Sequence, residues 1–150
     1  MKREIKVRLI KHITFLGNEL QDFESFNSLS WEGYSKERAT RRNVERWIEN
    51  IINSSIDISK TILVSENIPL PDTYKELVAS ISLVPGFNKE DMDTLSEWVR
   101  FRNIIAHEYL DIRWASAKKF IQETEAVYRN FLDQVKEYLK RQIEITTKGE

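Results

Sequence analysis

Three side chains that can act on a phosphate lie close together in the stretch RFRNIIAHEYLDI, residues 100–112. Arg102 carries a planar guanidinium that binds phosphate oxygens through two N–H groups at once. His107 can give or take a proton near neutral pH. Tyr109 offers a hydroxyl that can be modified, and Asn103 adds an amide that can orient His107 or the phosphate. The combination indicates chemistry on a phosphate, with Arg102 and His107 as the catalytic candidates.

Each of these residues also has a structural interpretation. Burying an unpaired charge costs on the order of several kcal/mol. Arg102 can therefore pair with a buried carboxylate or extend its charged head into solvent. His107 can be an ordinary hydrogen-bonded helix residue, and Tyr109 a core residue whose hydroxyl is satisfied. The residue types alone leave both interpretations open.

The sequence carries no motif for a metal or a bound cofactor. It has no cysteine and no His-Glu-x-x-His run, and only two histidines in all. It also lacks a glycine-rich phosphate loop and a Gly-x-Ser-x-Gly nucleophile turn. We therefore expect no metal site and no cofactor.

Apolar residues repeat at three- and four-residue spacing along most of the chain, which is typical of amphipathic helices. The pattern predicts helices over about residues 2–26 and 36–64, and a third, shorter helix with Pro71 in its first turn that ends at Pro85-Gly86. A fourth helix, capped by Asn88, should run to about Tyr109, and a fifth should be capped by Asp111. The 150 residues thus predict one domain (1–150), an all-α, up-and-down bundle of about five helices.

The fourth helix must position the candidate residues. At about 100° per residue, Arg102 and Tyr109 point into the centre of its apolar stripe. His107 lies roughly 140° from Arg102, too far round an ideal helix for both to reach one phosphate easily. A local bend or a second copy of the chain would solve this, and Phe101 and Ile104 are candidates for the apolar patch that a dimer requires.

Composition excludes several classes of protein. Hydrophobic residues make up 41% of the chain and charged residues 31%, which is typical of a globular domain. The net charge of −1 gives no overall attraction to nucleic acid or membrane. No stretch approaches the roughly 18 to 20 apolar residues of a membrane span, and the charged N-terminus is no signal peptide. We therefore expect a cytoplasmic protein with no membrane contact.

A stripe of arginines on the second helix is a candidate RNA-binding surface. Arg38, Arg42 and Arg46 recur every four residues, so their charges can follow a phosphate backbone. Glutamates are interleaved with them, and a solvated, salt-bridged face is the equally weighted alternative. Nearby aromatic residues (Trp31, Tyr34 and Trp47) can stack bases, but core packing is favoured for them. His12, the other histidine, lies in the apolar stripe of the first helix and is interpreted as structural.

The pattern Arg-x-x-x-x-His-x-Tyr, formed by Arg102, His107 and Tyr109, resembles the signature of the HepT-like proteins of the HEPN superfamily. Asn103 directly after the arginine and the following LDI match the common form. The long segment VERWIENIINSSIDISKTI and the position of the motif also agree, so the resemblance covers essentially the whole chain. The chain departs from the family at Asn53, where an acidic residue is more common.

This resemblance implies a HEPN-like helical fold and a function. HepT-like proteins are toxins of two-component toxin–antitoxin systems that cut RNA without a metal, as homodimers with the two motifs facing each other. Their antitoxin is a minimal nucleotidyltransferase of the MntA type, which silences the toxin by attaching AMP to the motif tyrosine. Carried over to this chain, Arg102 and His107 would be catalytic and Tyr109 the site of AMPylation.

Two alternatives to a ribonuclease stay open. In the first, the same residues hold a nucleotide for a partner nucleotidyltransferase, and this chain cleaves nothing. In the second, the chain is a helical dimerisation module in which Arg102 is simply paired with a carboxylate.

Overall fold

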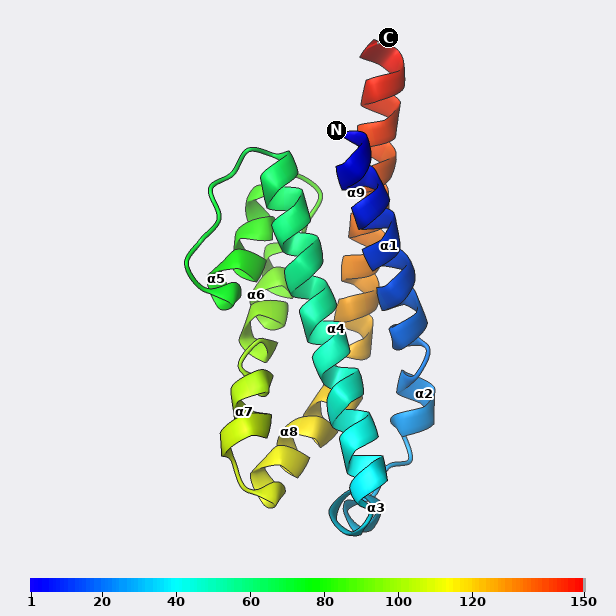
Figure 1. The fold of residues 1–150 in the computed structure, drawn as a ribbon, viewed down its shortest axis with the longest axis vertical. Coiled ribbons are helices and arrows are strands. Elements are labelled where there is room, and N and C mark those ends of the chain that lie inside the picture. Colours follow the sequence, from blue (N-terminus) through cyan, green and yellow to red (C-terminus); the bar gives the residue numbers. More distant parts are fainter. Residues whose placement is uncertain (150) are drawn as a thin grey trace.

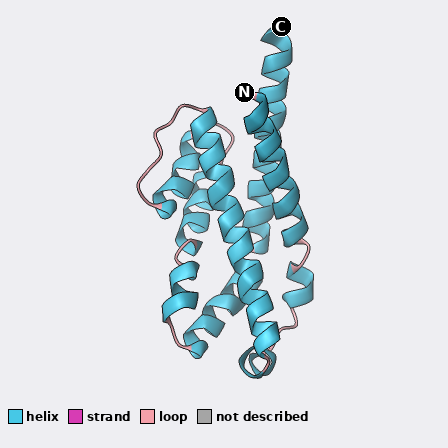
Figure 2. Cartoon of the chain, viewed as in Figure 1, coloured by secondary structure: helices cyan, strands magenta, loops and turns pink. Residues whose placement is uncertain are grey.

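The computed structural model describes the backbone of residues 1–149 and the side chains of residues 1–145, and within that part of the chain it contains helices and no strand (Figures 1 and 2). The helices are α1 (Arg3–Leu20), α2 (Phe23–Phe26), α3 (Trp31–Lys36), α4 (Arg38–Ser65), α5 (Tyr74–Ala79), α6 (Lys89–Trp98), α7 (Phe101–His107), α8 (Leu110–Glu123) and α9 (Glu125–Gly149), with a 3₁₀ turn over Ser80–Leu83. The predicted all-α bundle is confirmed.

Helix α4 is the central element. It packs against α1 on one side, against α5 and α6 on the other, and against α3 and α8 near its N-terminal end (Figure 1). The residues that recur along it at three- and four-residue spacing form a buried stripe: Val44, Ile48, Ile51, Ser55, Ile58 and Ile62 are each 0% exposed. Because the side chains of this stripe pack against α1, α6 and α9, α4 lies at the centre of the core.

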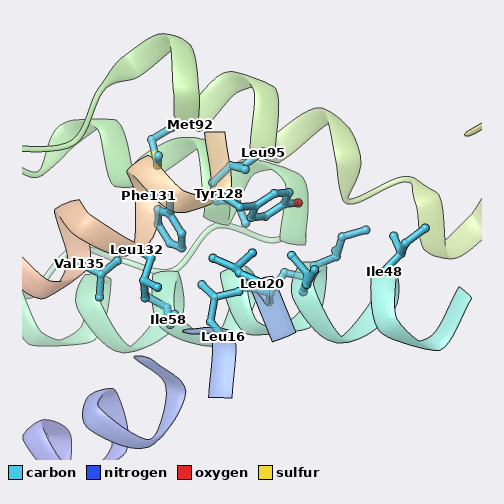
Figure 3. Close-up of a cluster of buried hydrophobic side chains, with 14 of the residues drawn as sticks. Leu16, Leu20, Ile48, Ile58, Met92, Leu95, Tyr128, Phe131, Leu132 and Val135 are labelled. Carbon is cyan, nitrogen blue, oxygen red and sulfur yellow. The ribbon is translucent and has the colours of Figure 1, made fainter. Parts of the chain in front are cut away.

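The core joins residues from both ends of the chain. Leu16 and Leu20 of α1 pack with Met92 and Leu95 of α6 and with side chains of α9 (Figure 3). The four named residues are each 0% exposed. Burying an aliphatic side chain of this size contributes about 1.5–3 kcal/mol, so this cluster rather than any polar contact holds the bundle together.

Several predicted helices are interrupted in the structure. The first divides into α1 and α2, and the fifth into α8 and α9 at Thr124, whose hydroxyl donates to the carbonyl of Phe120 at 2.7 Å. Pro71 does not start α5: Thr73 caps that helix instead, accepting a hydrogen bond from the Glu76 amide at 3.2 Å. The expected cap at Asn88 is confirmed, since its side chain accepts from the Asp91 amide at 3.0 Å.

Candidate functional site

The predicted fourth helix breaks in two, directly before the candidate residues. Helix α6 ends at Trp98 and α7 begins at Phe101, and the turn between them is tightened by a hydrogen bond from the Asn103 amide to the Arg100 carbonyl at 2.9 Å. A bond between residues three apart belongs to a 3₁₀ turn, which advances about 120° per residue instead of 100°. The break therefore rotates everything after it relative to a continuous helix.

This rotation overturns the predicted orientation of Arg102. Phe101 takes the core position, fully buried with its ring centroid 6.3 Å from that of Trp98 and 6.5 Å from that of Phe120. Arg102 is exposed. The predictions that Arg102 points into the apolar stripe and that Phe101 belongs to an outward dimer patch are both wrong, because each assumed an unbroken helix.

Arg102 has no carboxylate partner among the described residues, whose ion pairs all involve other side chains. Its guanidinium carbon lies instead 5.5 Å from the ring centroid of Tyr74, at the start of α5. An aromatic ring attracts a guanidinium without accepting its N–H groups in ordinary hydrogen bonds. All five N–H donors of Arg102 thus remain available to an anion.

Arg102 and Asn103 line an open groove of about 640 Å³ between α7, α5 and the middle of α4. Tyr74, Lys75 and Arg100 also line it, as does Glu49. Glu49 lies one helical turn before Asn53 on α4. The groove thus has an acidic side chain on its α4 side, although position 53 itself carries an asparagine.

His107 and Tyr109 lie beyond this groove. His107 is the last residue of α7, where the chain turns extended through Glu108 (ψ 158°) and Tyr109 (ψ 163°) before α8 begins at Leu110. His107 is exposed, and Tyr109 is 83% exposed. The helix thus ends two residues before the predicted end at Tyr109, and the expected cap at Asp111 is wrong because Tyr109 occupies the cap position. Tyr109 is a surface side chain, not part of an apolar stripe.

Within one chain, Arg102 and His107 diverge. Both lie on α7, five residues apart, which separates their Cα atoms by about 140° around the axis and about 7.5 Å along it. The break before Phe101 does not change this, because it precedes both residues. One subunit therefore presents the guanidinium and the imidazole on different sides of the same short helix.

A partly buried ion pair holds the start of α8, and with it Tyr109, in place. Arg113, in the first turn of α8, donates from Nε to the Oε2 of Glu45 at 2.8 Å and from Nη2 to Oε1. Tyr34 of α3 donates its hydroxyl to the same carboxylate, and its ring centroid lies 5.1 Å from that of Trp114. Glu45 is only 6% exposed. Since a helix is rigid over one turn, this anchor sets the position of the turn that carries Tyr109.

The contacts of the anchor raise the pKa of Tyr34 and of Arg113. Burial, and then the hydrogen bond to Glu45, raises the pKa of Tyr34 above its ordinary value, so its hydroxyl stays a neutral donor. The hydrogen bond to Glu45 raises the pKa of Arg113 in the same way. Sequence reasoning missed this pair. The available signal was Glu45, one of the glutamates interleaved with the arginine stripe, which directly follows Val44 of the buried face of α4.

The remaining candidates divide between core and surface. Tyr34 and Trp47 are buried, which confirms core packing for them, while Trp31 is 45% exposed and packs against Trp114 at 6.3 Å. Arg38, Arg42 and Arg46 are exposed on α4, and the ion pairs found in the described part of the chain include none of them. Their exposure agrees with a solvated face as well as with an RNA-binding surface, and the RNA-binding role of these arginines stays a prediction.

His12 is half-buried on α1 and lines a separate hollow with Asp57 and Lys60 of α4. Among the described residues, no group of three or more His, Cys, Asp or Glu side chains is placed to hold a metal ion. Nor does any helix in that part of the chain combine the length and the apolar character needed to cross a bilayer.

Comparison with known families decides the assignment. A family model described as "Ribonuclease HepT-like" matches residues 16–135, which is most of the chain. The chain belongs to the HepT-like family. Its motif residues 102–109 lie inside the matched region, so the family resemblance of the motif and that of the whole HepT-like chain agree.

Solved structures show the same fold. A crystal structure of a mutant toxin–antitoxin complex, MntA–HpeT, contains a chain 16% identical to this HepT-like chain, with a TM-score of 0.75 over 85% of this chain and 96% of that one. A tri-AMPylated HEPN toxin from Shewanella oneidensis, in complex with its MNT antitoxin, is 15% identical, with a TM-score of 0.74 over 91% and 98%. At such low identity these similarities show the fold alone. No curated protein matches the chain.

Proposed function

We propose that this chain is the RNA-cleaving toxin of a toxin–antitoxin pair, acting in the cytoplasm as a homodimer. The observation that carries the proposal is the state of α7: Arg102 and His107 both stand exposed on it, and the described residues offer neither an ion pair. A charge left free beside a groove is available for a substrate phosphate. Membership of a family described as ribonucleases supports the same conclusion.

The reaction uses the substrate's own nucleophile and needs no metal. The 2′-hydroxyl of the RNA attacks the adjacent phosphorus and displaces the 5′-oxygen of the next nucleotide, which leaves a 2′,3′-cyclic phosphate. One His107 accepts the proton of the 2′-hydroxyl and the other donates a proton to the leaving 5′-oxygen. Arg102 stabilises the charge on the phosphate oxygens, and Asn103 supports the orientation of the phosphate or of His107.

A dimer resolves the divergence of Arg102 and His107 within one chain. Two copies supply two imidazoles, one for each proton transfer, and allow Arg102 of one subunit to face His107 of its partner. Support for an interface comes from Ile104 and Ile112, which line a groove of about 550 Å³ between α7 and α8. Ile112 is 44% exposed, so its apolar surface is open to a second copy.

Tyr109 is the proposed site of silencing. Its hydroxyl would attack the α-phosphate of ATP on a minimal nucleotidyltransferase of the MntA type, forming a tyrosyl-AMP ester and releasing pyrophosphate. Its 83% exposure supports access by that partner. A similar structure is described as a tri-AMPylated toxin bound to an MNT antitoxin, which supports the same partner here. In the proposed dimer cleft, the added negative charge would repel the substrate phosphate.

The test is RNA cleavage by purified protein without added metal. His107→Ala should lower the cleavage rate by about 10²- to 10⁴-fold while the thermal unfolding curve is unchanged, because His107 is exposed. His12→Ala is the matched control and should cleave normally. Full activity of His107→Ala would refute the mechanism. If the wild-type protein cleaves no RNA but binds ATP or AMP, a non-catalytic nucleotide-binding subunit would be favoured.

A further inference from the structure

Tyr74 is the aromatic residue at the start of α5, and it does not enter the core. Leu77, Val78 and Ile81, which follow it, are at most 4% exposed, whereas Tyr74 is 53% exposed. A half-exposed aromatic ring presents apolar surface that can pack against another flat group. Its place at the first residue of α5 puts it on the rim of the groove that Arg102 lines.

The contact with Arg102 links this ring to the proposed reaction centre. With the guanidinium carbon 5.5 Å from its centroid, the ring orients Arg102 and leaves the N–H donors of Arg102 free. A phosphate bound by Arg102 would therefore lie within one nucleotide of the Tyr74 ring, because successive phosphates of a single strand are about as far apart as these groups. The ring is then within reach of the base attached next to that phosphate.

The charges around the groove suit a polyanion. Arg100 and Arg102 both line it, and no ion pair in the described part of the chain involves either one. Lys75 also lines it, but its amine is held by Glu97 at 3.1 Å. Glu49 supplies the opposing charge on the α4 side. Two free guanidinium groups beside an open aromatic ring form the combination with which proteins bind single-stranded nucleic acid.

We infer that the groove between α5 and α7 is a nucleotide subsite, in which Tyr74 stacks on the base next to the phosphate held by Arg102. This inference rests on the proposed function and adds a determinant of substrate binding to it. Stacking accepts any base but depends on a base being present, so the subsite positions a single-stranded segment and not a duplex. Tyr74 is a positioning residue, distinct from the residues that transfer protons.

The experiment measures the affinity of the full-length protein for a 2′-O-methyl RNA oligonucleotide, which cannot be cleaved because its 2′-oxygens are blocked. Tyr74→Leu should weaken binding about tenfold in fluorescence anisotropy, since a base stacked on an aromatic residue contributes about 1–3 kcal/mol. Tyr74→Phe, which keeps the ring, should bind as the wild type does. Phe15→Leu removes a ring of similar exposure (43%) on α1 and is the matched control.

Abasic sites placed one at a time along the oligonucleotide identify the stacked base. At one position the abasic site should weaken binding by the wild type about tenfold and leave Tyr74→Leu unaffected, because the two changes remove the same contact. Wild-type affinity of Tyr74→Leu, or equal losses at every abasic position, would overturn the inference. So would an absence of RNA binding by the wild type.

The two proposals fail in different ways. If the wild type binds the blocked RNA through Tyr74 but cleaves no unmodified RNA, the subsite stands and the proposed ribonuclease activity does not. If it cleaves RNA and Tyr74→Leu binds and cleaves normally, the activity stands and the subsite does not. If Tyr74→Leu fails to fold, Tyr74→Gln, which has no ring and suits a half-exposed position, replaces it in the abasic scan.

Discussion

Two arginines eleven residues apart occupy opposite kinds of environment. Arg113 is largely buried, and its guanidinium meets the carboxylate of Glu45 in a two-pronged pair that Tyr34 completes. Arg102 is exposed, has no carboxylate partner among the described residues and rests on the ring of Tyr74. In the first arrangement, both charges are neutralised by a partner within the chain. The second leaves a cation ready for an anion from outside, which is what a binding site requires.

The comparison assigns the two regions different tasks. The corner formed by α3, α4 and α8 is closed: it fixes where α8 begins and therefore where Tyr109 stands. The helix α7 is open: its polar residues face solvent and grooves, and its hold on the core depends chiefly on Phe101. Substitutions in the closed corner should change stability, and substitutions in the open region should change activity.

The largest effect is expected from opening the closed corner. Glu45→Ala leaves Arg113 and the Tyr34 hydroxyl without their shared acceptor, and should lower the free energy of unfolding by about 3–5 kcal/mol. Urea denaturation followed by circular dichroism measures this. Glu49→Ala, one turn away on the same helix and half-buried, should cost less than about 1 kcal/mol. Equal losses for the two variants would show that the pair contributes nothing specific.

In the open region the effect should fall on catalysis. Arg102→Met keeps the side-chain volume and removes the charge, and should reduce RNA cleavage by about 10²- to 10³-fold. The free energy of unfolding should change by no more than about 0.5 kcal/mol, because the side chain is exposed. Arg8→Met, exposed on α1, is the control and should cleave normally. An active Arg102→Met protein would support a purely structural role for this arginine.

The closed corner can be tested more finely by removing one hydroxyl. Tyr34→Phe deletes the donor to Glu45 and should cost about 1.5 kcal/mol, the contribution of a hydrogen bond to a charged group. Tyr128→Phe is the matched control, since the Tyr128 hydroxyl is buried with no hydrogen-bond partner in the structure. That change should be neutral or slightly stabilising. If the control loses as much, the loss reflects packing and not the bond to Glu45.

The smallest effect is expected from the arginine stripe on α4. If these exposed residues follow the RNA backbone, Arg42→Ala should weaken RNA binding slightly and reduce the slope of log affinity against log salt by about one. The loss should be the same for RNAs of different sequence. Lys136→Ala, exposed on α9, should change neither quantity. An unchanged salt slope for Arg42→Ala would remove the stripe from the binding surface.

Much of the fold was predictable because helices have a short sequence period. The buried stripe of α4 and the cap at Asn88 follow from spacing and residue type alone, and both are confirmed. The breaks at residues 99–100 and at Thr124 were missed. A helix break without proline or glycine cannot be recognised from the local sequence, because it depends on how the side chains of that helix pack against the neighbouring helices.

The motif could be recognised in the sequence, whereas the contacts of its residues with other helices could not. Arg102, His107 and Tyr109 identified the family that the comparison confirms, because residue type and spacing are sequence properties. The contact between Arg102 and Tyr74 joins residues 28 positions apart, and the ion pair between Arg113 and Glu45 joins residues 68 positions apart. Contacts at such separations depend on how the helices pack. The sequence alone therefore determined which chemical groups are available, and the tertiary structure decided which of them are neutralised internally and which remain free for a substrate.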